Sequence, residues 1–510
     1  MTKSAFRWTA LVFLAALVAV NSYRAATQSI VHDEALTWQI YLAGPASTIF
    51  QYYDANNHFL ATILFRISTA LFGVSELSMR LPTLLAGAWF LWTVLRLCTL
   101  IAGEGWSMWI GIAAVTLNPL LLDFLVAARG YGLAIAGLFW GLYQMLAWFD
   151  ESARGLPEGE LRKRLWKAAL GMSIAVAANL TMLIPAFVMA VLFCGLLLRA
   201  TGKQAIREAP PAKTRKKSNK PKPRETRRAA SGAARVLHFG VPVAALAVIF
   251  FLAAPIDAAR AGDFYVGTQT ARASLENLAA SSFAYTEALR NHAVRGLWLG
   301  FAIVFLLVAP VAALIVALRR KAAERAVVDV AMLLASMTVI GSAVLLVCAH
   351  WAVGLPYPQD RTGLYFVPSA TLSAFALSGR ATVLWRKIIL TALIVVAAGY
   401  AAEWNTSSFL VWRYDADTKR IFEVLEKSPR PAAQVLLGAS WVLEPSLNFY
   451  RVLRHADWLA QVRRDGFGGS RQFYVVAPDD RGVIRRRGLR VIYRGPVSGT
   501  VLARPGAAAQ

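Results

Sequence analysis

The chain has 510 residues, of which 57% are hydrophobic and only 16% charged, and its formal net charge is +25. Its mean hydropathy is +0.49. Several stretches reach the roughly 20 apolar residues that a helix needs to cross a bilayer, which excludes an ordinary soluble protein. The positive residues lie in short segments between apolar runs, which indicates membrane topology and anionic head groups rather than nucleic acid. Cys98, Cys194 and Cys348 fall inside apolar runs, so neither a disulfide framework nor a zinc site is predicted.

The long apolar runs predict a polytopic α-helical membrane protein with about 11 transmembrane helices. The first run is expected to be retained as a span, because no small-residue cleavage site follows it. A break near Asn179 and Pro185 is expected to divide residues 167–199 into two short helices, whereas one long tilted helix would invert every later span. The predicted spans cover residues 8–22, 81–101, 107–125, 131–149, 167–182, 183–199, 236–254, 296–318, 328–349, 363–380 and 387–403.

The side on which each loop lies follows from its charge, because Lys- and Arg-rich loops face the cytoplasm. A short apolar run at residues 58–73 decides the parity. If this run crosses the membrane, every later basic loop falls outside. If it lies flat on the outer face or re-enters it, those loops fall inside together with Lys3 and Arg7, and this second arrangement is predicted. The strongest basic loops cover residues 154–167, 203–235, 319–325 and 380–387.

This topology predicts a transmembrane domain at residues 1–403 and a soluble periplasmic domain at residues 404–510. The second region has short alternating apolar stretches and one helical pattern at 417–427, which predicts a small α/β domain. The N-terminus and the basic loop 200–235 are then cytoplasmic, and this proline-containing loop is expected to touch anionic lipid. Four segments are predicted to meet on the outer face: residues 23–80, 127–131, 255–295 and 355–362.

An acidic pair, Asp33-Glu34, follows the first apolar run. Carboxylates at the mouth of a bundle of spans are typical of a general base or an ion site, since they are seldom needed to hold the bundle together. The alternative is structural: the pair would cap an amphipathic helix at residues 35–42, whose positive end favours acidic residues. Both interpretations can hold, with one residue for each.

Further motifs follow the acidic pair in a fixed order. A flat amphipathic stretch covers residues 56–60 (Asn-Asn-His-Phe-Leu), Arg-Leu-Pro stands at 80–82, and Ala-Arg-Gly-Tyr at 128–131 opens the fourth span. This order resembles the GT-C superfamily of polyprenyl-phosphate-sugar-dependent glycosyltransferases. Relatives in that superfamily include the protein O-mannosyltransferases and the lipid A aminoarabinose transferase. The resemblance covers residues 8–200, is loose through the later spans, and is absent as a motif from 404–510.

The resemblance implies a GT-C-like transmembrane domain in which Asp33 is the catalytic base, with Glu34 as its catalytic neighbour. The base deprotonates an acceptor hydroxyl or amine, which then attacks the anomeric carbon with inversion and expels the lipid phosphate. Several relatives carry a second acidic residue at the outer end of the third span. This chain has Val126-Ala-Ala-Arg129 there, and the nearest acid, Asp123, lies about a helical turn deeper. No cofactor is therefore certain, no metal ligand is assigned, and a divalent metal ion stays open.

Several residues near the acidic pair are predicted to bind the phosphate or the sugar of the donor. His58 is one, and its alternative is an ordinary interfacial histidine. Arg129, beside Tyr131, offers a fork of donors that suits a phosphate ester, and its alternative is a plain helix-end arginine. Arg66 and Arg80 are interpreted as arginines that extend to lipid head groups.

The turn at residues 356–361 (Pro-Tyr-Pro-Gln-Asp-Arg) is short, rigid and predicted to be external. Arg361 opposes the positive-inside trend there and so requires a reason. It either binds the donor phosphate or pairs locally with Asp360. Tyr357 is predicted to stack on a sugar face, with a membrane-interface position as the alternative.

The sequence therefore predicts an inverting glycosyltransferase of the hexosyl or pentosyl type in a bacterial-type inner membrane. It would move a sugar from a polyprenyl-phosphate donor to a glycan, lipid or protein acceptor on the periplasmic side. The alternative is a flippase or transporter of lipid-linked saccharides. Such proteins usually show internal repeats and ionisable residues deep within their spans, and the carboxylates of this chain gather instead at one mouth. Neither the sugar nor the acceptor follows from the sequence.

Overall fold

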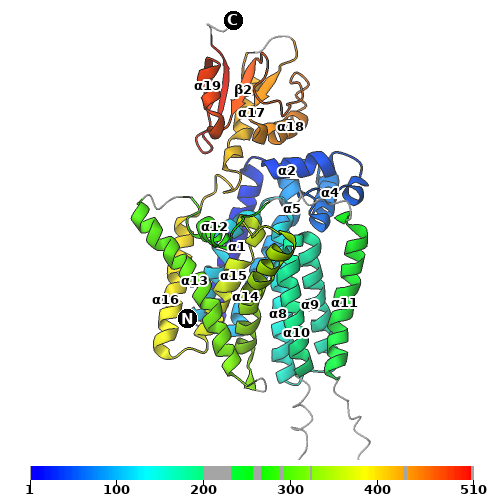
Figure 1. Cartoon of the computed structure of the whole chain (residues 1–510), viewed down its shortest axis with the longest axis vertical. Coiled ribbons are helices and arrows are strands. Elements are labelled where there is room, and N and C mark those ends of the chain that lie inside the picture. Colours follow the sequence, from blue (N-terminus) through cyan, green and yellow to red (C-terminus); the bar gives the residue numbers. More distant parts are fainter. Residues whose placement is uncertain are drawn as a thin grey trace, which may run out of the picture.

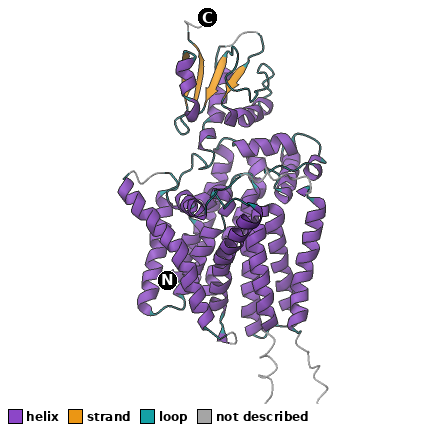
Figure 2. Cartoon of the chain, in the orientation of Figure 1, coloured by secondary structure: helices purple, strands orange, loops and turns teal. Residues whose placement is uncertain are grey.

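A computed structural model of the chain describes residues 2–199, 231–256, 266–286, 291–321, 324–429 and 433–506. Most of the chain forms a bundle of helices, and a smaller region that carries the strands lies at one end of it (Figure 1, Figure 2). Residues 200–230 of the predicted basic loop fall outside the described ranges. The long helices are α1 (Lys3–Thr27), α5 (Glu76–Ala102), α8 (Gly130–Ala153), α9 (Glu158–Ala178), α10 (Leu183–Arg199), α11 (Gly232–Ala253), α13 (His292–Arg319), α14 (Val327–Val353) and α16 (Val383–Ala402).

Within the described ranges, 8 helices are long and apolar enough to cross a membrane by length and composition. The protein is thus a multi-pass helical membrane protein, and the count of about 11 crossings stays a prediction. Three predicted spans fall short for visible reasons. α6 (Trp106–Thr116) ends where Asn118 and Pro119 interrupt the run and α7 (Pro119–Phe124) begins. α9 opens with charged residues, and α15 (Phe366–Ser378) has only 13 residues.

The apolar stretch at residues 167–199 forms two helices, as predicted. α9 ends at Ala178, and Asn179 is extended, with φ −162° and ψ 123°. After the 3₁₀ turn η2 (Leu180–Met182) the chain continues as α10. The Asn179 side chain stabilises this break, because its Oδ1 accepts a hydrogen bond from the Thr181 backbone N at 3.0 Å. α9 and α10 lie side by side in the bundle (Figure 1), and the direction in which the later helices cross the membrane stays a prediction.

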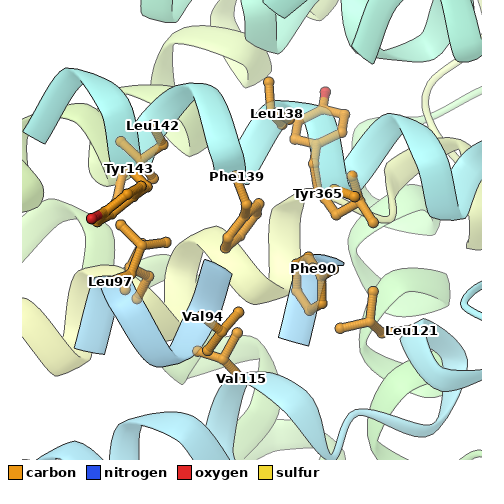
Figure 3. Close-up of a cluster of buried hydrophobic side chains, with 14 of the residues drawn as sticks. Phe90, Val94, Leu97, Val115, Leu121, Leu138, Phe139, Leu142, Tyr143 and Tyr365 are labelled. Atoms are coloured by element: carbon orange, nitrogen blue, oxygen red, sulfur yellow. The ribbon is translucent and has the colours of Figure 1, made fainter. Parts of the chain in front are cut away.

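Small residues allow α8 and α9 to pack closely. A Cβ on Gly137 of α8 would lie 2.8 Å from the backbone O of Gly171 on α9, and the reverse distance is also 2.8 Å. Such contacts are typical of helix pairs in membranes, where small residues let two backbones approach. α8 also packs against α5, where the ring centroids of Phe90 and Phe139 lie 5.2 Å apart in the apolar cluster of Figure 3. This packing fixes the position of the chain turn that precedes α8.

Short helices cover one end of the bundle (Figure 1). They are α2 (His32–Thr37), the π-helical turn η1 (Trp38–Leu42), α3 (Thr48–Gln51), α4 (Phe59–Phe72) and α12 (Ala271–Phe283). α4 has 14 residues and is about 21 Å long, which is less than the roughly 30 Å of a bilayer core. This length agrees with the flat or re-entrant arrangement predicted for residues 58–73, whose side of the membrane stays a prediction.

The region after residue 403 contains a 4-stranded sheet in the order β1-β2-β4-β3. β1 and β2 are parallel, and β4 is antiparallel to both β2 and β3. The alternating apolar stretches lie at residues 434–438, 472–477 and 488–493, and β1, β2 and β3 overlap them. The sequence did not predict β4, which ends in Pro505, or α18. The elements are α17 (Thr418–Lys427), β1 (Leu437–Ala439), α18 (Glu444–Leu453), β2 (Phe473–Val476), α19 (Gly482–Arg486), β3 (Leu489–Arg494) and β4 (Val501–Pro505), with 3₁₀ turns η8 (Arg413–Asp415), η9 (Trp441–Leu443) and η10 (Pro478–Asp480).

The C-terminal region packs directly on the segment that carries the acidic pair. Tyr450 of α18 accepts a hydrogen bond from the Ile30 backbone N at 2.9 Å and donates one to Glu76 at 3.0 Å. Asp415 accepts a hydrogen bond from the His32 backbone N at 2.7 Å. Burial raises the pKa of Asp415 to about 8, so this side chain is protonated at neutral pH. Residues far away in the sequence therefore hold the backbone just before the acidic pair.

Candidate functional site

A cavity of about 400 Å³ lies where the four predicted outer-face segments meet. The predicted meeting of these segments is therefore confirmed. They contribute Asp33 and His58 from residues 23–80, Arg129 and Tyr131 from 127–131, Ile256 and Val266 from 255–295, and Pro358 and Arg361 from 355–362. The cavity thus brings a carboxylate, two guanidinium groups and an imidazole together, and apolar side chains line part of its wall.

Asp33 lines this cavity and faces two arginines. Its Oδ2 lies 3.4 Å from Nη2 of Arg361 and 3.7 Å from Nη2 of Arg129. Both distances exceed the roughly 2.8 Å of a charge-assisted hydrogen bond, so the two pairs are loose. Burial by itself would raise the pKa of Asp33. Arg129 and Arg361, with smaller contributions from His32 and a hydrogen bond from Trp412, outweigh burial and lower that pKa below its usual value.

Glu34 is fully buried and does not line the cavity. Its carboxylate pairs with Arg80 through Nε at 2.9 Å and Nη2 at 2.6 Å. It also accepts hydrogen bonds from the backbone N of Ala128 at 2.6 Å and from the backbone N of Val31 at 3.1 Å. The contact with Val31 closes the N-terminus of α2, so the capping alternative holds for Glu34. Glu34 thereby ties α2, α5 and the turn before α8 together.

Arg80 was misread from the sequence as an arginine that extends to head groups. The residue is fully buried, and besides Glu34 it donates hydrogen bonds to the carbonyl oxygens of Ala25, Gln28 and Ser29. A charged group that leaves water needs such a complete set of partners. Arg80 therefore fixes the end of α1 as well as the acidic pair.

Arg129 reaches Asp33 because α8 begins in the middle of the site. Its Nη1 donates to Asn56 Oδ1 at 2.7 Å and to Thr37 Oγ1 at 3.2 Å. The guanidinium is 2% exposed, and its Nε has no hydrogen-bond partner among the described residues. A buried cation with one free donor, beside a cavity, is suited to an anionic ligand.

Gly130 determines how closely this turn approaches its neighbours. A Cβ there would lie 2.0 Å from the Ala178 carbonyl O and 2.6 Å from His58 Cβ. We expect Gly130→Ala to separate α8 from the end of α9 and to destabilise the protein by about 1–3 kcal/mol. Transfer activity should fall more than stability does, because Arg129 moves with the turn. Thermal unfolding and activity of the purified variant measure both effects.

Gly240→Ala is the matched control for this substitution. A Cβ at Gly240 of α11 meets nothing within 4 Å, so the control should unfold at the same or a higher temperature than the wild type. A Gly130→Ala variant as stable and active as Gly240→Ala would contradict the close approach at Gly130.

Arg361 belongs to the 3₁₀ turn η7 (Asp360–Gly363) and bridges two sides of the cavity. Besides Asp33 it contacts the Tyr131 side chain by a hydrogen bond, and its Cζ lies 5.6 Å from the ring centroid of Trp412. The carboxylate nearest to its guanidinium is that of Asp33, whereas the backbone N of Asp360 donates to Asn277 at 2.7 Å. Asp360 and Tyr357 do not line the cavity, and Tyr357 stacks on His350 with ring centroids 4.4 Å apart.

His58 and Tyr131 form one corner of the cavity, with ring centroids 5.1 Å apart. Burial, together with Arg129 and Arg361, lowers the pKa of His58 well below its usual value, so the ring is neutral at neutral pH. Its Nε2 is buried and has no hydrogen-bond partner in the described part of the chain. His58 therefore offers an uncharged polar atom to a ligand.

Asp123 is held away from the cavity by a network of its own. It pairs with Arg24, accepts a hydrogen bond from Tyr285, and accepts the Leu410 backbone N at 2.8 Å. Within the ranges that the structure describes, no group of three or more His, Cys, Asp or Glu residues is placed to hold a metal ion. Asp33 itself faces two cations, and this surrounding does not suit a divalent metal ligand.

The apolar part of the cavity continues toward the bilayer. A second cavity of about 210 Å³ lies between α9, α10 and α11, and its wall is almost wholly apolar. The two cavities share Leu183 and Phe251. Leu183 is 42% exposed and Phe251 47% exposed on the surface of the bundle. The apolar cavity between α9, α10 and α11 therefore forms a groove that opens on the side of the bundle, where lipid tails are expected.

Sequence reasoning missed several residues that complete the site. Asn56 and Thr37 hold Arg129, and Trp412 contacts both Asp33 and Arg361. Asn56 stands in the amphipathic stretch that was singled out, so its position carried a signal. Trp412 lies nearly 400 residues beyond Asp33, and no local pattern indicates that contact.

Comparison with known proteins gives matches by structure. No protein-family model matches the sequence, and no curated protein matches it. ArnT from Cupriavidus metallidurans is similar in its apo state (TM-score 0.48, 15% identity, 99% of each chain) and bound to undecaprenyl phosphate (TM-score 0.40, 17% identity, 99% of each chain). An oligosaccharyltransferase from Archaeoglobus fulgidus is similar with a TM-score of 0.45 and 12% identity, over 96% of this chain and 73% of that one.

ArnT and the oligosaccharyltransferase are similar to this chain in structure only, and the GT-C resemblance predicted from the order of the sequence motifs stays a prediction. At these identities and TM-scores we take no residue role, substrate or mechanism from them.

Proposed function

We propose that the protein is an inverting glycosyltransferase that uses a polyprenyl-phosphate-linked sugar. The observation that carries the proposal is the position of Asp33, a buried carboxylate at a cavity wall that faces the guanidinium groups of Arg129 and Arg361 at 3.7 and 3.4 Å. Asp33 is the general base in this proposal. Glu34 positions it through Arg80 and Ala128 and does not itself touch the substrate.

The charges of this group match those of the proposed donor. Two arginines and one aspartate carry a net charge of +1, and a phosphodiester carries −1. A phosphate between Arg129 and Arg361 would compete with Asp33 for their donors and so weaken the loose pairs described above. Asp33 would then become a stronger base at the moment when the donor is in place.

The reaction balances without a further reactant. The acceptor hydroxyl or amine gives its proton to Asp33, and its oxygen or nitrogen forms a bond to the anomeric carbon. The bond from that carbon to the phosphate oxygen breaks, and its electron pair leaves with the polyprenyl phosphate. The fixed arginines stabilise the negative charge that develops on the leaving phosphate. The apolar groove of α9, α10 and α11 is placed to hold the first part of the lipid tail.

The transporter alternative finds less support. Two buried acids at the ends of apolar runs, Asp123 and Asp329, are each paired with an arginine, Arg24 and Arg380. Residues that carry ions or substrates through a bundle need freedom to change partners, and these pairs do not provide it.

The gene deletion gives the direct test of function. Mass spectrometry of lipids and glycans from the deletion strain should show one missing glycosylated product and more of its polyprenyl-phosphate-linked sugar. The wild-type gene should restore the product, and a gene with Asp33→Asn should not. An unchanged profile in the deletion strain would overturn the proposed reaction.

Arg129→Lys and Arg361→Lys should each weaken binding of polyprenyl phosphate, the leaving product, by about 1–3 kcal/mol. Lysine keeps the charge, but it loses the planar fork of donors that a phosphate accepts. The double variant should show a coupling energy if both side chains bind one phosphate. Lipid titration of the purified protein in detergent measures the affinities, and wild-type affinity in both single variants would exclude a phosphate site here.

The proposed orientation places the N-terminus in the cytoplasm and the region after 403 in the periplasm. In a background without the three native cysteines, a cysteine at Arg162 should resist an impermeant thiol reagent added outside. A cysteine at Gln269, an exposed residue just before α12, should react. Labelling at position 162 with protection at 269 would reverse the orientation.

A further inference from the structure

The break between α9 and α10 brings uncharged polar groups to the cavity, and some of their atoms have no hydrogen-bond partner in the part of the chain that the structure describes. Asn179 and Thr181 both line the cavity. Asn179 Oδ1 is used by the Thr181 backbone N, whereas Asn179 Nδ2 and Thr181 Oγ1 are buried atoms without a hydrogen-bond partner in the described structure. Asn179 is only 3% exposed, so its free amide hydrogens are directed into protein or cavity, not into bulk solvent.

The neighbouring wall of the cavity, formed by Asn57 and His58, also carries buried polar atoms without a partner among the described residues. Asn57 uses its Nδ2 on the carbonyl oxygens of Ile49 and Tyr52, at 3.0 and 3.2 Å. Its Oδ1 is buried without a partner among described residues, as is Nε2 of His58, and both residues line the cavity. Four residues that line the cavity thus carry, within the described structure, two unpartnered donor or hydroxyl groups and two unpartnered atoms that can accept a hydrogen bond.

The close approach at Gly130 holds these two walls together. The position that a Cβ would occupy on Gly130 is within 2.0 Å of the Ala178 carbonyl, next to Asn179, and within 2.6 Å of His58. A buried polar atom left without a partner is unfavourable, so a cluster of four such atoms at one cavity indicates a ligand with matching polar groups. The cluster lies in the cavity of Asp33, yet none of its four members carries a charge.

We propose that Asn57, His58, Asn179 and Thr181 form the subsite for the sugar ring of the donor, and that this sugar is uncharged. Hydroxyl groups donate and accept hydrogen bonds, and this mixed set of donors and acceptors complements them. An amino sugar would bring an ammonium group close to Arg129 and Arg361, and none of the four residues of the subsite is acidic. A sugar acid would bring a second negative charge beside the phosphate that already occupies Arg129 and Arg361, and the histidine of this wall is neutral. The inference rests on the proposed function, since the sugar enters with its lipid phosphate.

Binding of synthetic lipids to the purified full-length protein tests this subsite. The probes are a polyprenyl phosphate without sugar, a panel of its neutral hexosyl and pentosyl esters, an aminoarabinosyl ester and a glucuronosyl ester. At least one neutral ester should bind the wild type more tightly than the bare phosphate and than both charged esters. Thr181→Val keeps the side-chain volume but removes the hydroxyl. It should weaken binding of that ester about 5- to 30-fold and leave binding of the bare phosphate unchanged.

Asn179→Asp extends the test in the opposite direction. The substitution keeps an acceptor for the Thr181 backbone N but replaces the free amide donor by a carboxylate oxygen. It should weaken binding of the neutral ester and strengthen binding of the aminoarabinosyl ester. Thr116→Val is the matched control, because Thr116 is a buried threonine whose hydroxyl bonds to the Ile112 carbonyl at 2.8 Å, and it does not line the cavity.

The outcomes separate the two proposals. A wild-type protein that binds none of the lipids, bare phosphate included, would overturn the proposed function and the subsite with it. If the wild type and Thr181→Val both bind the bare phosphate and every ester with the same affinity, the subsite alone is overturned. Tightest binding of the aminoarabinosyl or glucuronosyl ester by the wild type would also overturn it.

Discussion

Asp33→Asn should reduce sugar transfer by about 10²- to 10⁴-fold while the protein remains folded in the membrane. An asparagine side chain cannot accept the acceptor's proton, but it fills the same space beside Arg129 and Arg361. Removing the negative charge frees both arginines, so polyprenyl phosphate should bind at least as tightly as to the wild type. Turnover and lipid affinity of the purified variant measure the two effects separately, and Asp479→Asn, at an exposed position, is the control.

The pH dependence adds a second measure of Asp33. Its pKa is lowered in the free protein, so the base is ionised from neutral pH down to below the usual aspartate range. The acid limb of kcat/KM due to Asp33 should therefore lie below about pH 4. Donor phosphate on the two arginines removes much of what lowers that pKa, so the acid limb of kcat should lie at higher pH. Near-normal turnover of Asp33→Asn would remove Asp33 from the role of base.

Arg80→Leu should destabilise the protein more than any other single substitution considered for this site, by about 3–5 kcal/mol. It leaves the Glu34 carboxylate buried with no cation, and it also removes donors from three carbonyl groups at the end of α1. Thermal unfolding in detergent and the yield of folded protein measure the loss. Arg272→Leu removes an exposed arginine that pairs with Glu276 one turn away, and it should change stability little.

A double variant shows how much of the lost stability comes from the unpaired buried charge of Glu34. Glu34→Leu with Arg80→Leu removes both charges and should recover part of the stability, because no lone buried charge remains. Recovery should be incomplete, since the backbone N of Ala128 and Val31 also lose their acceptor. Equal stability of Arg80→Leu and the wild type would show that Glu34 does not depend on this arginine.

The sequence predicted the elements whose signal is local. Apolar runs predicted the long helices, and Asn179 with Pro185 predicted the break between α9 and α10. The order of motifs predicted that Asp33 and Arg129 belong to one site, and opposition to the charge rule drew attention to Arg361. The charge pattern also placed the segments that form the cavity at one end of the bundle.

The roles of neighbouring residues could not be predicted, because they depend on the direction of each side chain. Asp33 and Glu34 are adjacent in the sequence, yet one lines the cavity and the other is enclosed by Arg80 and backbone amides. In the turn at 356–361, Arg361 lines the cavity while Tyr357 turns to His350. Only the packing of distant elements decides these directions, and hydropathy and spacing do not carry that information.

The contact between His32 and Asp415 has a consequence for how the protein is made. The two residues are 383 positions apart, and the contacts of Trp412 and Tyr450 with the same segment span similar separations. At about 5–20 residues per second, a ribosome needs roughly 20–80 s to reach the second partner after the first. In the proposed orientation the segment around Asp33 is exported early, and it lacks its final support until the last hundred or so residues have followed. A truncated chain that stops before this region inserts all its long helices and still lacks an assembled site.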